Sequence, residues 1–313
     1  MDNAAYDSYY KKAEIKLYKT DEASIAVRVY GAGPALMLVH GFPVHGYTWR
    51  KMLPKLAEKF TCYVIDLPGL GDSVWTSGTD FTFTGQARRL AKLLEMLQIT
   101  ECAILAQDTG ATVSRLVAAS EPKKIKKLAI INTEMPHHRP PWIPLYRILA
   151  KLPGSNTMFR CIFASPIVRT SMGLKGFYSN SSLLHDPNSL TPYVKPLVKS
   201  AKKMAGMLGY LKGIEWNVVD DLVSTHKHIK ADTMIIWGED DKIFPVEIAE
   251  KMSKQFNGNS QFIRISNAKL MPHEEKPEQL LEYVIPFFLN LSPTQTEQRG
   301  GTKLAGGGYS TIS

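Results

Sequence analysis

The chain has 313 residues, a net charge of +9 and a hydrophobic fraction of 44%. These proportions are ordinary for a globular protein and exclude a largely disordered chain, a collagen-like chain and a coiled coil. The three cysteines are an odd number and none has metal-ligand spacing, which argues against a disulfide framework and a zinc site. We therefore expect neither a bound metal nor a cofactor.

The N-terminal residues lack the apolar stretch of a secretion signal, and no run of about 18 apolar residues occurs. We therefore expect a cytoplasmic protein that does not insert into a membrane. The basic net charge suits nucleic acid, an anionic surface or an acidic ligand. No basic-aromatic motif accompanies the charge, so we expect no nucleic-acid partner, and a small-molecule substrate is preferred. The sequence gives no oligomeric state.

Short apolar runs alternate with segments of helical periodicity, in the order typical of parallel βαβ units. The predicted strands are 25–30, 35–39, 62–65, 103–106, 127–132, 233–237 and 261–265. The predicted helices are 49–60, 83–99, 110–120, 198–211, 246–256 and 278–291. The sequence thus predicts an α/β fold with a doubly wound, mostly parallel sheet.

The rhythm of strands and helices is lost over residues 136–221. An insertion between two strands of such a sheet usually lies over the carboxyl ends of the strands, where ligands bind. We therefore predict a helical cap or lid at 136–221, a core of 13–135 and 222–291, and a flexible C-terminal tail at 292–313. The cap contains 11 Lys+Arg and 4 Asp+Glu, so 11 − 4 = +7 of the net charge lies there. This predicts a basic outer face or an entrance that attracts anionic substrates.

Three motifs follow three of the predicted strands and should meet at one edge of the sheet. They are His40-Gly-Phe-Pro43, Ala106-Gln-Asp-Thr-Gly110 and Trp237-Gly-Glu-Asp-Asp241. A nucleophile elbow needs small residues two before and two after its apex, because the turn from strand to helix is sharp. Ala106 and Gly110 provide them, which places Asp108 at the apex. The other interpretation of Asp108 is a helix N-cap.

With these motifs, and with Asp66-Leu-Pro-Gly-Leu-Gly-Asp-Ser73, residues 13 to 291 resemble the α/β-hydrolase superfamily. The resemblance is to the group of epoxide hydrolases, haloalkane dehalogenases and fluoroacetate dehalogenases. It implies an α/β-hydrolase fold with an inserted helical cap. It also implies that the Asp108 carboxylate attacks a saturated carbon and forms an alkyl-enzyme ester. The backbone N–H groups of Phe42 and Thr109 would then form the oxyanion hole.

The resemblance places the acid that orients a catalytic imidazole at Asp241, with Glu134 as an alternative. The place of the imidazole itself is occupied by Leu270, with Lys269 in the place of the preceding glycine. His273 lies three residues further on. It is either a substitute base, reached by a remodelled loop, or a residue at the start of a helix. His40 is interpreted as a buried histidine that bonds the backbone.

Two further departures concern the substrate. Haloalkane dehalogenases commonly place a tryptophan after the nucleophile, where this chain has Thr109, and the cap tyrosines are Tyr146, Tyr178, Tyr193 and Tyr210. Two functions remain open. One is a hydrolase of epoxides or alkyl halides, impaired by the missing base. The other is a non-catalytic ligand-binding protein that keeps the pocket.

Overall fold

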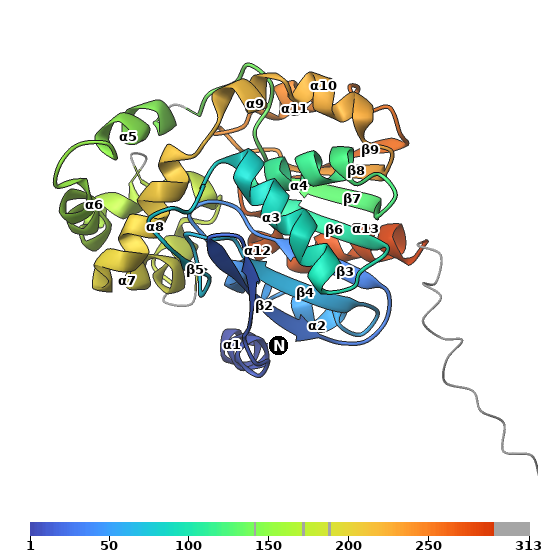
Figure 1. Ribbon diagram of the computed structural model, residues 1–313, viewed down its shortest axis with the longest axis horizontal. Helices are drawn as coiled ribbons and strands as arrows, with labels where there is room; N and C mark the ends of the chain where they lie inside the picture. Colours follow the sequence, from blue (N-terminus) through green and yellow to red (C-terminus); the bar gives the residue numbers. More distant parts are fainter. Residues whose placement is uncertain (141, 171–172, 187–188, 291–313) are drawn as a thin grey trace, which may run out of the picture.

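The computed structural model describes residues 1–290, apart from 141, 171–172 and 187–188. At its centre lies a sheet whose main path runs β1-β2-β4-β3-β6-β7-β8-β9, with β5 paired to β2 (Figure 1). The strands are β1 Lys16–Thr20, β2 Ala23–Tyr30, β3 Ala35–Val39, β4 Thr61–Asp66, β5 Val74–Trp75, β6 Cys102–Gln107, β7 Ile125–Ile131, β8 Asp232–Gly238 and β9 Ser260–Ile265. Strands β4, β3, β6, β7, β8 and β9 pair in parallel, and β1, β2 and β5 pair antiparallel. The predicted fold class is confirmed.

Helices cover both faces of this sheet. The helices outside the 136–221 segment are α1 Asn3–Lys11, α2 Leu53–Leu56, α3 Phe83–Met96, α4 Thr109–Ser120, α10 Leu222–His228, α11 Val246–Ser253, α12 Pro272–Glu275 and α13 Pro277–Leu289, with the 3-10 turn η1 Gly46–Trp49. In Figure 1 helices α3 and α4 lie in front of the central strands and α13 lies behind them. Strands β3 and β6 are almost wholly buried between these layers, which explains their continuous apolar runs.

The N-terminal half departs from the prediction in three places. No long helix spans 49–60, because Pro54 cannot donate a backbone hydrogen bond and stands in the first turn of the short α2. Helix α3 ends at Met96 rather than at residue 99, and Gln98 has a left-handed φ of 55°. Strand β1 was not predicted. Its residues are mostly exposed at the edge of the sheet, so the sequence there lacks an apolar pattern.

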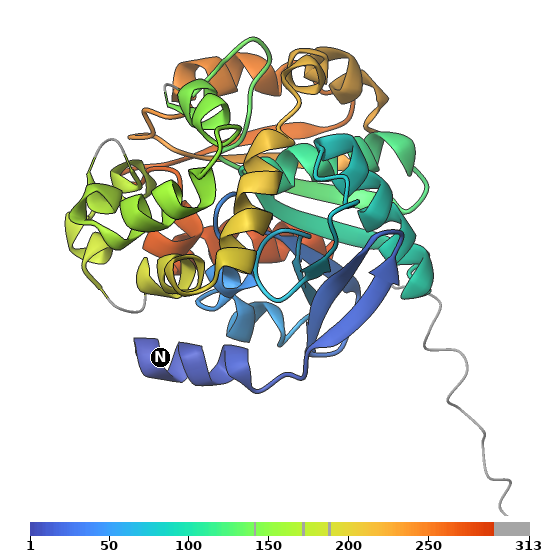
Figure 2. The same cartoon turned by 60° about the vertical axis from the view of Figure 1, so that its left-hand side comes forward.

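Between β7 and β8 the chain leaves the sheet and forms short helices. Those of the 136–221 segment are α5 Ile143–Leu149, α6 Ser155–Ala164, η2 Pro166–Arg169, η3 Lys175–Phe177, η4 Ser181–Leu184, α7 Thr191–Lys199, α8 Ala201–Lys212 and α9 Trp216–Asp220. Helices α5 to α8 gather at one end of the sheet, at the left of Figure 1, and Figure 2 shows the same group from a second direction. The predicted tail at 292–313 lies outside the described residues.

Candidate active site

Asp108 lies at the turn between β6 and α4 with a φ of 50° and a ψ of −132°. A non-glycine residue in this left-handed region is strained and is common at functional sites. The turn is also tightly packed, because a Cβ added at Gly110 would lie 2.1 Å from the carbonyl oxygen of His40. Ala106 is completely buried. The small residues expected around the apex are therefore required by the packing.

The Asp108 carboxylate points toward the loop that follows β3. The backbone N–H of Phe42 donates to Asp108 Oδ2 at 2.7 Å, and the Thr109 N–H also bonds this carboxyl. Both bonds favour the ionised form. Burial, reinforced by the negative charge of Glu134, outweighs them and raises the pKa of Asp108 well above its usual value. The side chain is thus held in place by two amide donors but retains its proton more strongly than an exposed aspartate.

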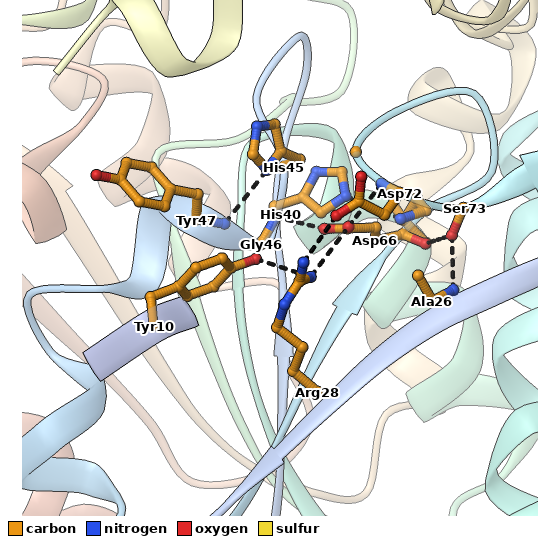
Figure 3. Close-up of polar contacts among 12 residues, drawn as sticks. Tyr10, Ala26, Arg28, His40, His45, Gly46, Tyr47, Asp66, Asp72 and Ser73 are labelled. Carbon is orange, nitrogen blue, oxygen red and sulfur yellow. Dashed lines mark hydrogen bonds and ion pairs between the residues drawn. The ribbon is translucent and has the colours of Figure 1, made fainter. Parts of the chain in front are cut away.

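A polar network, shown in Figure 3, anchors the loop that carries Phe42. The Asp66 carboxylate accepts hydrogen bonds from the backbone N–H groups of Gly46 at 2.7 Å and Asp72 at 2.8 Å. Arg28 pairs with Asp72 at 2.7 Å and lies 3.6 Å from Asp66. This network joins the loop after β3 to the loop after β4.

His40 has the structural role that its position suggested. Its Nε2 accepts the N–H of Leu67 at 2.8 Å, so Nδ1 carries the proton and donates to the carbonyl oxygen of Gly41 at 2.8 Å. Burial lowers the pKa of His40 to about 4, so the ring is neutral at physiological pH. It therefore bonds the backbone beneath the Phe42 loop and takes no part in acid–base chemistry.

An apolar cavity with a volume of about 150 Å³ lies above Asp108. Its floor comes from loops at the carboxyl ends of the strands, namely Phe42, Asp108, Glu134, Ile243 and Leu270. Its walls come from the 136–221 segment, including Trp142, Tyr146, Phe159, Phe163, Val168, Phe177 and Met207. Among the described lining residues Asp108 and Glu134 are the acids, and no histidine is present. The cavity suits a small apolar molecule.

Leu270 and His273, the two candidates for the position of the base, lie in different surroundings. Leu270 lines the cavity, where it presents an isobutyl group to the space above Asp108. His273 is completely buried in α12 but is not among the cavity-lining residues. Its Nε2 lies 2.6 Å from Thr48 Oγ1, and its ring packs on Trp49 with centroids 4.7 Å apart. The structure therefore does not bring His273 together with Asp108.

His273 belongs instead to a buried polar group around Glu274, which we call the Glu274 cluster (Thr48, Arg50, Tyr178, Tyr193, His273 and Glu274). Arg50 pairs with Glu274 at 3.1 Å, and both side chains are almost completely buried. Tyr178 and Tyr193, from the 136–221 segment, both donate to the Glu274 carboxylate. The cluster ties that segment to the loop after β3 and to α12.

Asp241 stands at the end of β8 and is held by three donors. Asn132 Nδ2 donates to its Oδ2 at 2.7 Å, and the N–H groups of Ile243 and Phe244 donate to its Oδ1 at 2.7 and 3.2 Å. Burial nevertheless raises the pKa of Asp241 to about 7. In this structure the carboxylate orients the loop that contributes Ile243 and Phe244 to the cavity, and among the described residues no imidazole bonds to it.

Glu134 follows β7 and lies directly at the cavity floor. Its Oε2 accepts the hydroxyls of Thr112 at 2.6 Å and Thr133 at 3.0 Å. Arg115, completely buried in α4, donates to both hydroxyls and to the Glu134 carbonyl oxygen. Sequence reasoning missed Arg115. The sequence did contain a signal for it, since Arg115 stands among small and apolar residues of a helix predicted to be buried. A buried cation of this kind needs an acidic or carbonyl partner.

The four tyrosines singled out in the 136–221 segment have separate positions. Tyr146 lines the cavity, whereas Tyr178 and Tyr193 bond Glu274. The hydroxyl of Tyr210 donates to Thr109 Oγ1 at 3.2 Å, and its ring stacks on Phe42. Tyr210 therefore packs against the two residues whose amides hold Asp108.

Within the described residues, no helix is long and apolar enough to cross a bilayer. The same part of the chain contains no group of three or more His, Cys, Asp or Glu residues placed to hold a metal ion. The carboxylates of Asp108, Glu134 and Asp241 are each held by backbone or side-chain donors instead.

Residues 34–277 match the sequence model of the alpha/beta hydrolase fold family. The chain belongs to this family. It is 22% identical to an uncharacterized hydrolase of Bacillus subtilis, YugF, over 80% of this chain and 89% of that protein. It is 23% identical to epoxide hydrolase 4 of Mus musculus, over 69% of this chain and 62% of that protein. Among solved structures, the epoxide hydrolase CorEH superimposes with a TM-score of 0.72 at 18% identity, over 89% of this chain and 99% of that one.

Proposed function

We propose that this α/β-hydrolase-fold protein uses Asp108 as a nucleophile toward a small apolar epoxide or alkyl halide and releases the resulting ester slowly. The observation that supports this most directly is the Asp108 carboxylate, which is held by the Phe42 amide and exposed to an apolar cavity. Similarity to epoxide hydrolases at low identity is consistent with such a substrate.

The first step forms a bond between a carboxylate oxygen of Asp108 and a saturated carbon of the substrate. With an alkyl halide, the carbon–halogen bond breaks and the halide leaves with the electron pair. With an epoxide, a ring carbon–oxygen bond breaks and the oxygen takes a proton from the hydroxyl of Tyr146, which lines the cavity. In both cases the product is an ester of Asp108, with its carbonyl oxygen bonded to the Phe42 amide.

The second step is hydrolysis of this ester and requires a base that removes a proton from water. Leu270 supplies no such group, and the described cavity lining contains no imidazole. The Glu134 carboxylate in that lining already accepts the hydroxyls of Thr112 and Thr133. Ester formation itself needs no base. The proposal therefore predicts one fast alkylation for each protein molecule, followed by slow release of the alcohol or diol.

The cavity volume limits the substrate. A volume of about 150 Å³ is that of an apolar cavity that accommodates benzene. We therefore expect short-chain or single-ring epoxides and bromides to react, and bulkier ones to be excluded.

Intact mass spectrometry tests the proposal. The protein is incubated with a panel of 1,2-epoxides and 1-bromoalkanes, and the modified peptide is sequenced. The expected result is a single adduct on Asp108, which is absent from an Asp108→Asn variant. An unmodified mass with every reagent, or rapid multiple turnover without an adduct, would overturn the proposal.

A second function is favoured by one specific observation. Burial raises the pKa of Asp108 well above its usual value and so disfavours the carboxylate form that would attack, as suits a cavity that only binds an apolar ligand. Reversible binding of the same epoxides, measured by calorimetry and accompanied by no adduct at any pH, would identify a ligand-binding protein.

A further inference from the structure

A row of large apolar side chains is exposed along helix α5 and the residues that flank it. Trp142, Leu145, Ile148 and Leu152 form this α5 patch, with exposed fractions of 43%, 43%, 62% and 48%. Figure 1 shows α5 at the outer rim of the molecule, at the opposite end from the last turns of α13. Single exposed apolar residues are common in globular proteins, but a contiguous group marks an interaction surface.

The spacing of these residues explains why they share a face. Residues three or four positions apart lie on the same side of a helix, which places Leu145 and Ile148 together on α5. Trp142 stands at the N-cap of the helix, and Leu152 lies three residues after its last residue. Ile143 and Tyr146 point the other way and line the cavity. Trp142 is part of both the patch and the cavity wall. The cavity thus borders the patch at Trp142.

The segment that carries the patch is rich in basic residues, of which Arg139 is paired with Asp220 of α9 at 2.6 Å. Residues 136–185 contain six basic residues and no Asp or Glu; the basic ones are Arg139, Arg147, Lys151, Arg160, Arg169 and Lys175. Lys151 is exposed and stands between the patch residues Ile148 and Leu152 in the sequence. An apolar face bordered by Lys and Arg, with a tryptophan, is typical of helices that lie in the interface of an anionic bilayer.

The same charge argues against a second copy of this chain as the occupant. A two-fold dimer places identical surfaces against each other, so each copy would bring the basic residues of this segment, such as Lys151, against those of the other. Like charges facing each other across an interface weaken it. An anionic lipid surface supplies the opposite charge together with an apolar layer for the α5 patch.

We propose that the α5 patch adsorbs peripherally to anionic lipid bilayers and opens the cavity toward the lipid, so that apolar molecules enter from the membrane. This goes beyond the chemistry of Asp108 and does not depend on it. Adsorption needs no membrane-spanning helix, because the patch buries only the outer face of α5.

Vesicle flotation with the full chain tests the proposal. The vesicles contain either phosphatidylcholine alone or an equal mixture of phosphatidylcholine and phosphatidylglycerol. The wild type should float with the anionic vesicles and remain in solution with the neutral ones. Raising the salt concentration should weaken binding, because electrostatic attraction to lipid is screened.

Two pairs of variants locate the binding surface. Ile148→Ser/Leu152→Ser should reduce vesicle affinity roughly tenfold or more, because two apolar side chains no longer enter the lipid. Leu17→Ser/Leu289→Ser is the matched control, since these leucines are 53% and 49% exposed on β1 and α13. Lys151→Glu should weaken binding to anionic vesicles, and Lys254→Glu, at an exposed site on another element, should not.

Three outcomes would overturn the proposal. The first is that the wild type binds neither kind of vesicle at low salt. The second is equal loss of binding in the patch and control variants. The third is a wild-type dimer that the patch substitutions dissociate, without vesicle binding. Since flotation requires no reaction, a failure here is distinguishable from a failure of Asp108 to form an ester.

Discussion

Gln107 Nε2 donates a hydrogen bond to the carbonyl oxygen of Leu270 at 3.3 Å. The other atom of the same amide, Gln107 Oε1, lies 2.5 Å from the position that a Cβ on Gly41 would occupy. The residue before Asp108 therefore touches both the loop that carries Gly41 and Phe42 and the loop that carries Leu270. This bond holds position 270 next to the turn that carries Asp108, even though the side chain at 270 is apolar.

Under the proposed function, the wild type is alkylated once at Asp108 and releases the product slowly. Leu270→His is expected to hydrolyse the Asp108 ester and so to catalyse repeated turnover. The imidazole would face the ester and remove a proton from water. The measurement is product formation in excess of protein concentration, together with the lifetime of the Asp108 adduct by mass spectrometry. Leu270→Ala makes similar room without a base and should keep the adduct. Persistence of the adduct in the histidine variant would argue against this account of Leu270.

Glu134→Gln is expected to speed alkylation at mildly acidic pH. Asp108 attacks only as a carboxylate, and the charge of Glu134 contributes to its raised pKa. Removing that charge lowers the pKa of Asp108, so the rising limb of the rate–pH profile moves to lower pH. Rates of adduct formation between pH 5 and 9 give the profile. Glu134→Asp keeps the negative charge and should leave the rising limb of the rate–pH profile nearly unchanged. A shift of this limb toward higher pH in Glu134→Gln would contradict the prediction.

Asp108→Asn is expected to stabilise the folded protein at neutral and alkaline pH. When folding raises the pKa of a carboxyl, the folded protein loses stability as the pH rises from the unfolded-state pKa toward the folded-state pKa. The loss is about 1.4 kcal/mol for each unit by which the two pKa values differ. The amide avoids this loss and its oxygen still accepts the Phe42 N–H. We expect a Tm at least about 2 °C above wild type at pH 8. The gain should disappear near pH 4, where Asp108 is protonated in the folded state, and a constant gain at all pH values would point to another cause.

His273→Ala is expected to destabilise the protein by about 3 kcal/mol and to leave the rate of adduct formation within about twofold of wild type. The substitution removes a fully buried ring from its packing on Trp49 and deletes the hydrogen bond between His273 and Thr48. Chemical denaturation gives the stability and mass spectrometry the rate. Loss of all product release in this variant, with its stability retained, would instead identify His273 as the base.

Much of the core could be predicted because its signals are local. The buried strands have continuous apolar runs in the sequence. The small residues Ala106 and Gly110 indicate the sharp turn at Asp108 without any knowledge of tertiary contacts. The position of His273 was different. Whether a side chain three residues past Leu270 turns toward Asp108 or toward Thr48 depends on Arg50, Tyr178 and Tyr193, which lie far away in the sequence. Helix α2 is short because of Pro54, which is a local cause. The apolar periodicity of residues 49–60 nevertheless predicted a longer helix.

The Arg50–Glu274 pair has a consequence for how molecules reach Asp108. Tyr178 and Tyr193 are anchored to this buried ion pair, and pulling them away would leave a carboxylate short of donors in a dry interior, at a cost of several kcal/mol. A hinged opening on that side is therefore a rare event. Trp142 and Tyr146 also line the cavity but are not part of the Glu274 cluster, so entry past these two side chains does not break the ion pair. Residence times of bound molecules should then follow side-chain motion at α5, not movement of a whole domain.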